Sequence, residues 1–167
     1  MFKPSRFIWG AVLAGTCVAA AAAPLTADET RWLQALAPVR TYAQAQGLPL
    51  DVVVQPQATA GYAPLAMAYI GGRCKLVLSM RGNPAVQEAL AGVDADFAAL
   101  AIETMAAHEL GHCWRYVRGD WHVWPAGFSA PPTQTADDAA AWAEIHATRR
   151  EEGFADLVAL AYVQRQH

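Results

Sequence analysis

The sequence has few charges and no cluster of positive ones. Only 16% of its 167 residues are charged, and 12 Lys+Arg stand against 15 Asp+Glu, which gives a formal net charge of −3. Binding to nucleic-acid phosphates requires grouped cations, so the composition excludes a nucleic-acid-binding protein. A hydrophobic content of 54% excludes a disordered chain. The length is typical of a single globular domain.

The longest uncharged run lies at the amino terminus. Lys3 and Arg6 precede a stretch without charges that ends in consecutive alanines. This order is typical of a secretory signal peptide, so we expect residues 1–22 to be cleaved and residues 23–167 to form one catalytic domain. Cleavage would remove both cations and leave an acidic protein with no stable membrane span. We therefore expect an exported protein, periplasmic or secreted.

Two alternatives to cleavage remain open. The hydrophobic run is short for a bilayer span, but it could stay in place as a membrane anchor. Cys17 could instead carry a lipid, as in bacterial lipoproteins. Thr16 stands directly before Cys17, where a lipobox has a small Gly, Ala or Ser, and Ala14 replaces the usual aliphatic residue. We favour cleavage over both.

Cysteines are scarce, and two of the three lie in the expected mature domain. Cys74 and Cys113 would then reside in a compartment that permits disulfides. We expect them to be bridged, which would close a loop of about 40 residues and stabilise the fold by roughly 4 kcal/mol. The alternative is a pair of buried thiols that only pack.

The hydrophobic pattern predicts an α+β domain with a small antiparallel or mixed sheet. A first helix is expected from the capping box at Thr26 and Glu29 to about Gln46, with a break at Pro38. Strands are then expected over 50–54, 65–70 and 75–80, with a tight turn at Gly71-Gly72. Helices are expected over roughly 85–91, 95–117 and 137–164, with a loop over 119–136.

The long helix over 95–117 contains the motif H-E-x-x-H, formed by His108, Glu109 and His112. Residues four positions apart share a helix face, so the two imidazoles can bind one Zn²⁺. Glu109 lies beside them, where it can act as a general base on water. Arginines occupy the two later positions that metzincins fill with Gly and His, which excludes that branch of the zincins.

A catalytic zinc site needs a third protein ligand. Glu152 and Asp156 share one face of the last expected helix, so Glu152 can bind the metal while Asp156 holds the outer nitrogen of a ligand histidine. Glu151 lacks such a partner and is expected to be a solvated charge. The rival third ligands, none of which has a supporting motif, are Asp120, His122, Glu144 and His146.

The group that would stabilise the oxyanion is not specified by a motif. We take His122, in the loop after the motif helix, as the candidate electrophile. The residues that compete with it for this role are Tyr116, His146, Arg149 and Tyr162.

The two helical segments resemble the gluzincin metallopeptidases, which include thermolysin and in which a ligand glutamate on a second helix follows H-E-x-x-H. The form E-x-x-A-D, here Glu152 to Asp156, is most similar to the CAAX prenyl endopeptidases and heat-shock membrane proteases. The resemblance implies a zincin-like fold in which a small sheet packs on the active-site helix and a second helix carries the last ligand. It implies one Zn²⁺ per chain on His108, His112 and Glu152, with Glu109 as general base and Asp156 in support.

Zincins present an edge strand to an extended peptide, and the resemblance places Lys75 to Met80 in that position. We therefore expect an exported zinc metallopeptidase that hydrolyses peptide bonds by metal-activated water. One alternative is an exported zinc-binding structural or interaction domain without turnover. Another is a zinc amidase that acts on a non-protein amide of the cell wall.

Overall fold

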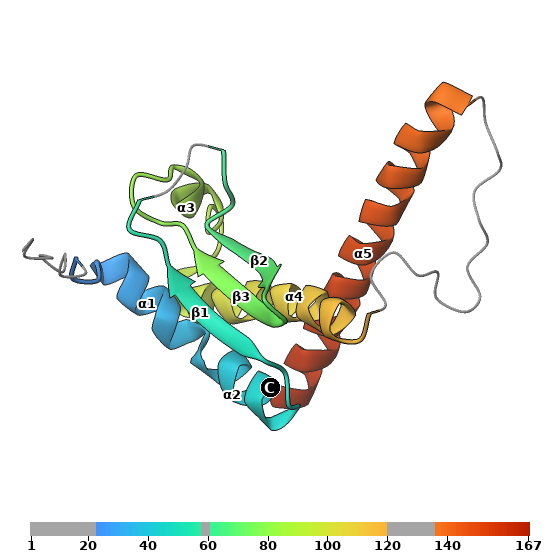
Figure 1. The fold of residues 1–167 in the computed structure, drawn as a ribbon. Coiled ribbons are helices and arrows are strands. Elements are labelled where there is room, and N and C mark those ends of the chain that lie inside the picture. The colour runs from blue at the N-terminus through green and yellow to red at the C-terminus, as the bar shows by residue number, and fades with distance from the viewer. Residues whose placement is uncertain (1–22, 58–60, 120–135) are drawn as a thin grey trace, which may run out of the picture.

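The computed structural model describes residues 23–57, 61–119 and 136–167, and the expected signal peptide lies outside these ranges (Figure 1). The elements are α1 (Ala27–Ala35), α2 (Ala37–Ala45), β1 (Leu50–Val54), β2 (Leu65–Ile70), β3 (Arg73–Leu78), α3 (Ala85–Glu88), the 3-10 turn η1 (Ala95–Phe97), α4 (Ala98–Val117) and α5 (Ala136–Gln166). This content confirms the predicted α+β class. No helix in the described ranges is both long and apolar enough to cross a bilayer.

The three strands form a mixed sheet in the order β1-β3-β2. β3 pairs in parallel with β1 and antiparallel with β2, so it is hydrogen-bonded on both sides. The expectation that the strand Lys75–Met80 forms the free edge is therefore wrong. The strand begins two residues earlier, at Arg73, and lies at the centre because β1 joins the β2–β3 hairpin on its β3 side. The edge nearest α4 belongs to β2.

Local signals at the amino-terminal helices are confirmed. Thr26 and Glu29 form a complete capping box at the start of α1. The helix breaks at Leu36, and Pro38 occupies the first turn of α2, where a missing N–H costs little. Glu29 is fully buried, and both of its oxygens accept hydrogen bonds from Arg81 at 2.8 Å. This ion pair ties α1 to the segment that follows β3.

The hydrophobic core lies between one face of the sheet and the helices α1, α2 and α4 (Figure 1). Trp32 from α1, Leu76 and Leu78 from β3, and Ile102 and Leu110 from α4 are each at most 1% exposed. Buried residues alternate along β3, so one face of this central strand packs against the helices.

The predicted disulfide between Cys74 and Cys113 is present. It connects the centre of the sheet to α4, and both cysteines are fully buried. Because Cys113 directly follows His112, the bridge anchors α4 to the sheet at the end of the H-E-x-x-H motif. Figure 1 shows that α5 crosses α4 with its carboxyl-terminal part, while its other end projects from the body of the domain.

Acid should weaken the ion pair between Glu29 and Arg81, and substitution of Glu29 should reveal how much this pair stabilises the fold. Hydrogen bonds from Arg81 lower the pKa of Glu29 from 4.5 to about 2. A lowered folded-state pKa stabilises the fold above the ordinary value, and this contribution disappears as the pH falls from about 4.5 towards 2. Glu29→Gln should therefore lower the free energy of unfolding near neutral pH by about 1–3 kcal/mol and flatten its decline in acid.

Urea unfolding between pH 7 and pH 2 measures this effect. Asp28→Asn is the matched control, since Asp28 is exposed in the same helical turn. Parallel pH profiles for the wild type and Glu29→Gln would contradict the assignment.

Candidate metal centre

The two histidines of the motif and Glu152 converge at the crossing of α4 and α5. The Nε2 atom of His108 lies 3.2 Å from the Nε2 atom of His112 and 3.2 Å from a carboxylate oxygen of Glu152. The other oxygen of Glu152 lies 3.8 Å from His112 Nε2. The expected proximity of these three side chains is therefore found, and within the described ranges they form a group whose ligand atoms lie within 4.8 Å of one another.

The spacing of these atoms fits a tetrahedral zinc ion. Ligand atoms held about 2.0–2.2 Å from a tetrahedral metal lie roughly 3.3–3.6 Å apart. The distances of 3.2 and 3.8 Å between the three groups bracket this range. Two imidazole nitrogens and one carboxylate oxygen are also a donor set that catalytic zinc sites use. The Glu152 side chain is 53% exposed, which leaves one side of the site open.

Asp156 orients one of the two histidines. His108 Nδ1 lies 2.9 Å from Asp156 Oδ1, as the i, i+4 spacing from Glu152 predicts. A proton on Nδ1 that is donated to Asp156 leaves the Nε2 lone pair directed at the metal position. Burial lowers the pKa of His112, which favours the neutral imidazole that a metal requires. Each effect favours the form of its histidine that can bind a metal ion.

Glu109 lies on α4 beside the three ligand groups and faces β2. Its carboxylate lies near the backbone N–H of Met67. Burial raises the pKa of Glu109 to about 7, against the opposing effects of His108 and of the Met67 backbone. A partly buried carboxylate with a pKa of about 7 can both accept and release a proton near neutral pH.

Close packing of α5 on α4 depends on Gly111, the fourth residue of the motif. A Cβ atom at this position would lie 2.7 Å from the Cα of Ala155 and 3.1 Å from its Cβ. Ala155 stands between Glu152 and Asp156 in sequence and is itself fully buried. The absent side chain at Gly111 therefore allows α5 to approach closely enough for its two acidic residues to reach the histidines.

A buried ion pair also connects α4 and α5 where the two helices cross. Arg115 donates two hydrogen bonds to the carboxylate of Glu151, at 2.8 and 2.9 Å, and its guanidinium also lies over the ring of Phe154. The expectation that Glu151 is a solvated charge is wrong, because its side chain is 2% exposed. The bidentate geometry fixes the rotation of α5 directly beside Glu152. No sequence motif marks Gly111 or Arg115 for this role.

A cavity of about 360 Å³ opens next to the metal position. Its apolar wall comes from the segment before β2, from the start of β2, from the residue that follows α3, and from α4 and α5. The residues that line it include Ala63, Leu65, Ala89, Met105 and Ala159, together with His108 and Glu109. A side chain held there would adjoin Glu109.

Among the remaining candidates from the sequence, those in the described part of the chain are not members of this group. Asp120 and His122 lie outside the described residues, as does the side chain of Glu144. His146 is on α5 but is not part of the cluster, and Arg149 is exposed. The Tyr162 hydroxyl donates to Glu103 at 2.7 Å, and Tyr116 stacks on Tyr69. The structure thus leaves His122 untested as an oxyanion stabiliser.

No protein-family model, curated protein or solved structure matches the chain. The candidate metal centre therefore depends on its own geometry. The likeness to gluzincins stays a prediction from the two motif segments, as does zincin-type packing of the sheet.

The Gly111 contact predicts that one methyl group disturbs metal binding. Gly111→Ala should push α5 away from α4 and lower zinc affinity by about 10- to 100-fold, because Glu152 and Asp156 move with that helix. Chelator competition measures the affinity, and urea unfolding in EDTA measures the stability of the metal-free protein.

Gly153→Ala is the matched control, since Gly153 lies on α5 and a Cβ there meets nothing within 4 Å. It should leave zinc affinity unchanged and stabilise α5 slightly. Equal zinc affinity in both alanine variants would show that the close approach does not position the ligands.

Proposed function

We propose that this protein is an exported zinc-dependent peptidase. The observation that carries the proposal is the convergence of His108, His112 and Glu152 with the half-buried carboxylate of Glu109 beside them. A purely structural zinc site would be closed by a fourth protein ligand. Within the described part of the chain the group has three members and one exposed side. The Cys74–Cys113 disulfide supports an oxidising compartment.

In the proposed reaction, each residue of the site has a separate role. His108, His112 and Glu152 would hold the metal, and Asp156 keeps His108 in the tautomer that binds it. When bound, zinc supplies a Lewis acid that polarises a carbonyl and lowers the pKa of water. Glu109 takes the proton from the attacking water and then delivers it to the departing amine.

The free edge of β2 supports an extended peptide as substrate. Ser79 donates its backbone N–H to the carbonyl of Pro64, so Pro64 faces β3. Backbone groups alternate along a strand, and therefore those of Leu65, Met67 and Tyr69 point away from β3. In the described ranges no further strand pairs with this edge. A peptide paired with the outward backbone groups of Leu65 and Tyr69 would pass Glu109, which lies near the Met67 backbone between them.

The cavity beside His108 and Glu109 would take one side chain of the bound peptide. Its apolar wall and its volume of about 360 Å³ suit an aliphatic or aromatic group. Because the cavity lies by Leu65, at the start of β2, and antiparallel pairing is the more stable arrangement, the residue in it would lie on the carboxyl side of the scissile bond.

Three substitutions separate the proposed roles. Glu109→Gln should keep zinc bound and reduce kcat by about 10²- to 10⁴-fold, since the amide cannot accept the proton. Glu152→Ala should lose zinc, because a ligand is removed. Asp156→Asn should weaken zinc binding or activity by about 10- to 100-fold, because His108 is then less well oriented.

Metal content and cleavage of a proteome-derived peptide library, both measured on the mature protein, provide the readout. Gly153→Ala serves as the control for substitutions on α5. Full turnover by Glu109→Gln would exclude the proposed base. A zinc-loaded wild type that cuts no peptide would instead favour the structural zinc domain or the cell-wall amidase.

A further inference from the structure

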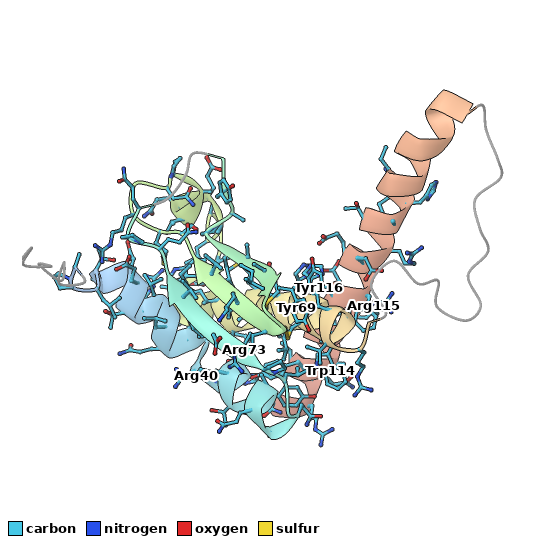
Figure 2. All side chains as sticks on the ribbon, viewed as in Figure 1. Arg40, Tyr69, Arg73, Trp114, Arg115 and Tyr116 are labelled. Carbon is cyan, nitrogen blue, oxygen red and sulfur yellow. A yellow bond between two sulfur atoms is a disulfide. The ribbon has the colours of Figure 1, made fainter. Side chains whose placement is uncertain are left out.

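Tyr69 and Tyr116 form a stacked aromatic pair next to the candidate metal centre. Their ring centroids are 5.2 Å apart and their planes differ by 2°. Tyr116 follows His112 by one helical turn on α4, and Tyr69 follows Met67 by two positions on β2. Figure 2 shows the two side chains together between the end of the sheet and α5. We refer to this pair as the tyrosine platform.

The tyrosine platform is incompletely covered. Tyr69 is 38% exposed, whereas Tyr116 is partly buried. A stack that served only to hold the hairpin against α4 would gain most by burying the Tyr69 ring. An exposed aromatic surface that continues the substrate edge of β2 is instead available to a ligand.

The platform and the cavity lie at opposite ends of β2. Leu65 lines the cavity, Met67 contacts Glu109, and Tyr69 belongs to the platform. These three residues have outward backbone groups and side chains on one face of the sheet. In a peptide paired with this edge, the residues opposite Leu65 and Tyr69 are four positions apart, or about 13 Å. Both project their side chains to the face that carries α4.

We propose that Tyr69 and Tyr116 determine substrate specificity by binding an aromatic side chain of the peptide on the amino side of the scissile bond. Antiparallel pairing with β2 makes the substrate run from the platform to the cavity, which sets this direction. A planar side chain gains an offset-stacked contact with the exposed ring that an aliphatic side chain of similar area lacks. The inference rests on the proposed peptidase function.

The preference appears as a ratio of two peptides in the zinc-loaded protein. With phenylalanine at the platform position, kcat/KM should exceed that for leucine by roughly 3- to 10-fold. Tyr69→Leu and Tyr116→Leu should reduce this ratio towards one, mainly through KM, because the contact is made equally in the ground and transition states. Tyr69→Phe and Tyr116→Phe should retain it, since the flat ring remains.

Binding to an inactive background gives a second readout. In Glu109→Gln, fluorescence polarisation should show the same preference for phenylalanine in Kd, and adding Tyr69→Leu should remove it. Tyr62→Leu is the matched control, because Tyr62 is 56% exposed in the segment before β2 and its backbone carbonyl, which the substitution keeps, accepts a hydrogen bond from Asn83. It should leave both ratios unchanged.

The possible outcomes distinguish failure of the tyrosine platform from failure of the proposed peptidase function. Library cleavage with the same profile in the wild type and in both leucine variants overturns the platform and leaves the peptidase function intact. An aromatic preference on the carboxyl side, or a platform effect confined to glycan-containing muropeptides, also overturns it. A zinc-loaded wild type that neither cuts nor binds any library peptide overturns both proposals.

Discussion

The close contact between α4 and α5 at Gly111 and Ala155 is the constraint on which the candidate metal centre depends. The histidines come from α4, whereas Glu152 and Asp156 come from α5, so no single helix can form the site. Zinc–ligand distances vary by only about 0.2 Å, and a helix displaced by one methyl group exceeds that tolerance. The buried pair of Arg115 with Glu151 prevents the rotation that close packing alone would permit.

The sheet holds the other side of α4. The disulfide from Cys74 to Cys113 fixes this helix to the central strand, and Glu109 contacts the backbone of the edge strand at Met67. α4 therefore carries the histidines and also faces the strand edge that would bind a peptide. Rigid elements on both sides keep a ligand set and a substrate edge in one geometry. This arrangement would allow a small domain to support the proposed hydrolytic site.

Features that depend on neighbouring residues were predictable. The capping box at Thr26, the Gly71-Gly72 turn and the helix break before Pro38 each follow from local backbone geometry. Helical periodicity also predicted that Glu152 and Asp156 share a face directed at the histidines. The same periodicity led to the wrong prediction for Glu151, which was expected to be solvated because it lacks an acidic partner four residues on but instead pairs with the buried Arg115.

The sequence by itself determined the α+β class, the disulfide pairing and the identities of the candidate ligands, because periodicity and the small number of cysteines leave few alternatives. Only the tertiary structure decided the strand order, the close packing at Gly111 and the stack of Tyr69 on Tyr116. These features arise where elements distant in sequence meet. Their geometry depends on which strands pair and on how closely two helices approach, and neither quantity leaves a periodic signal in the chain.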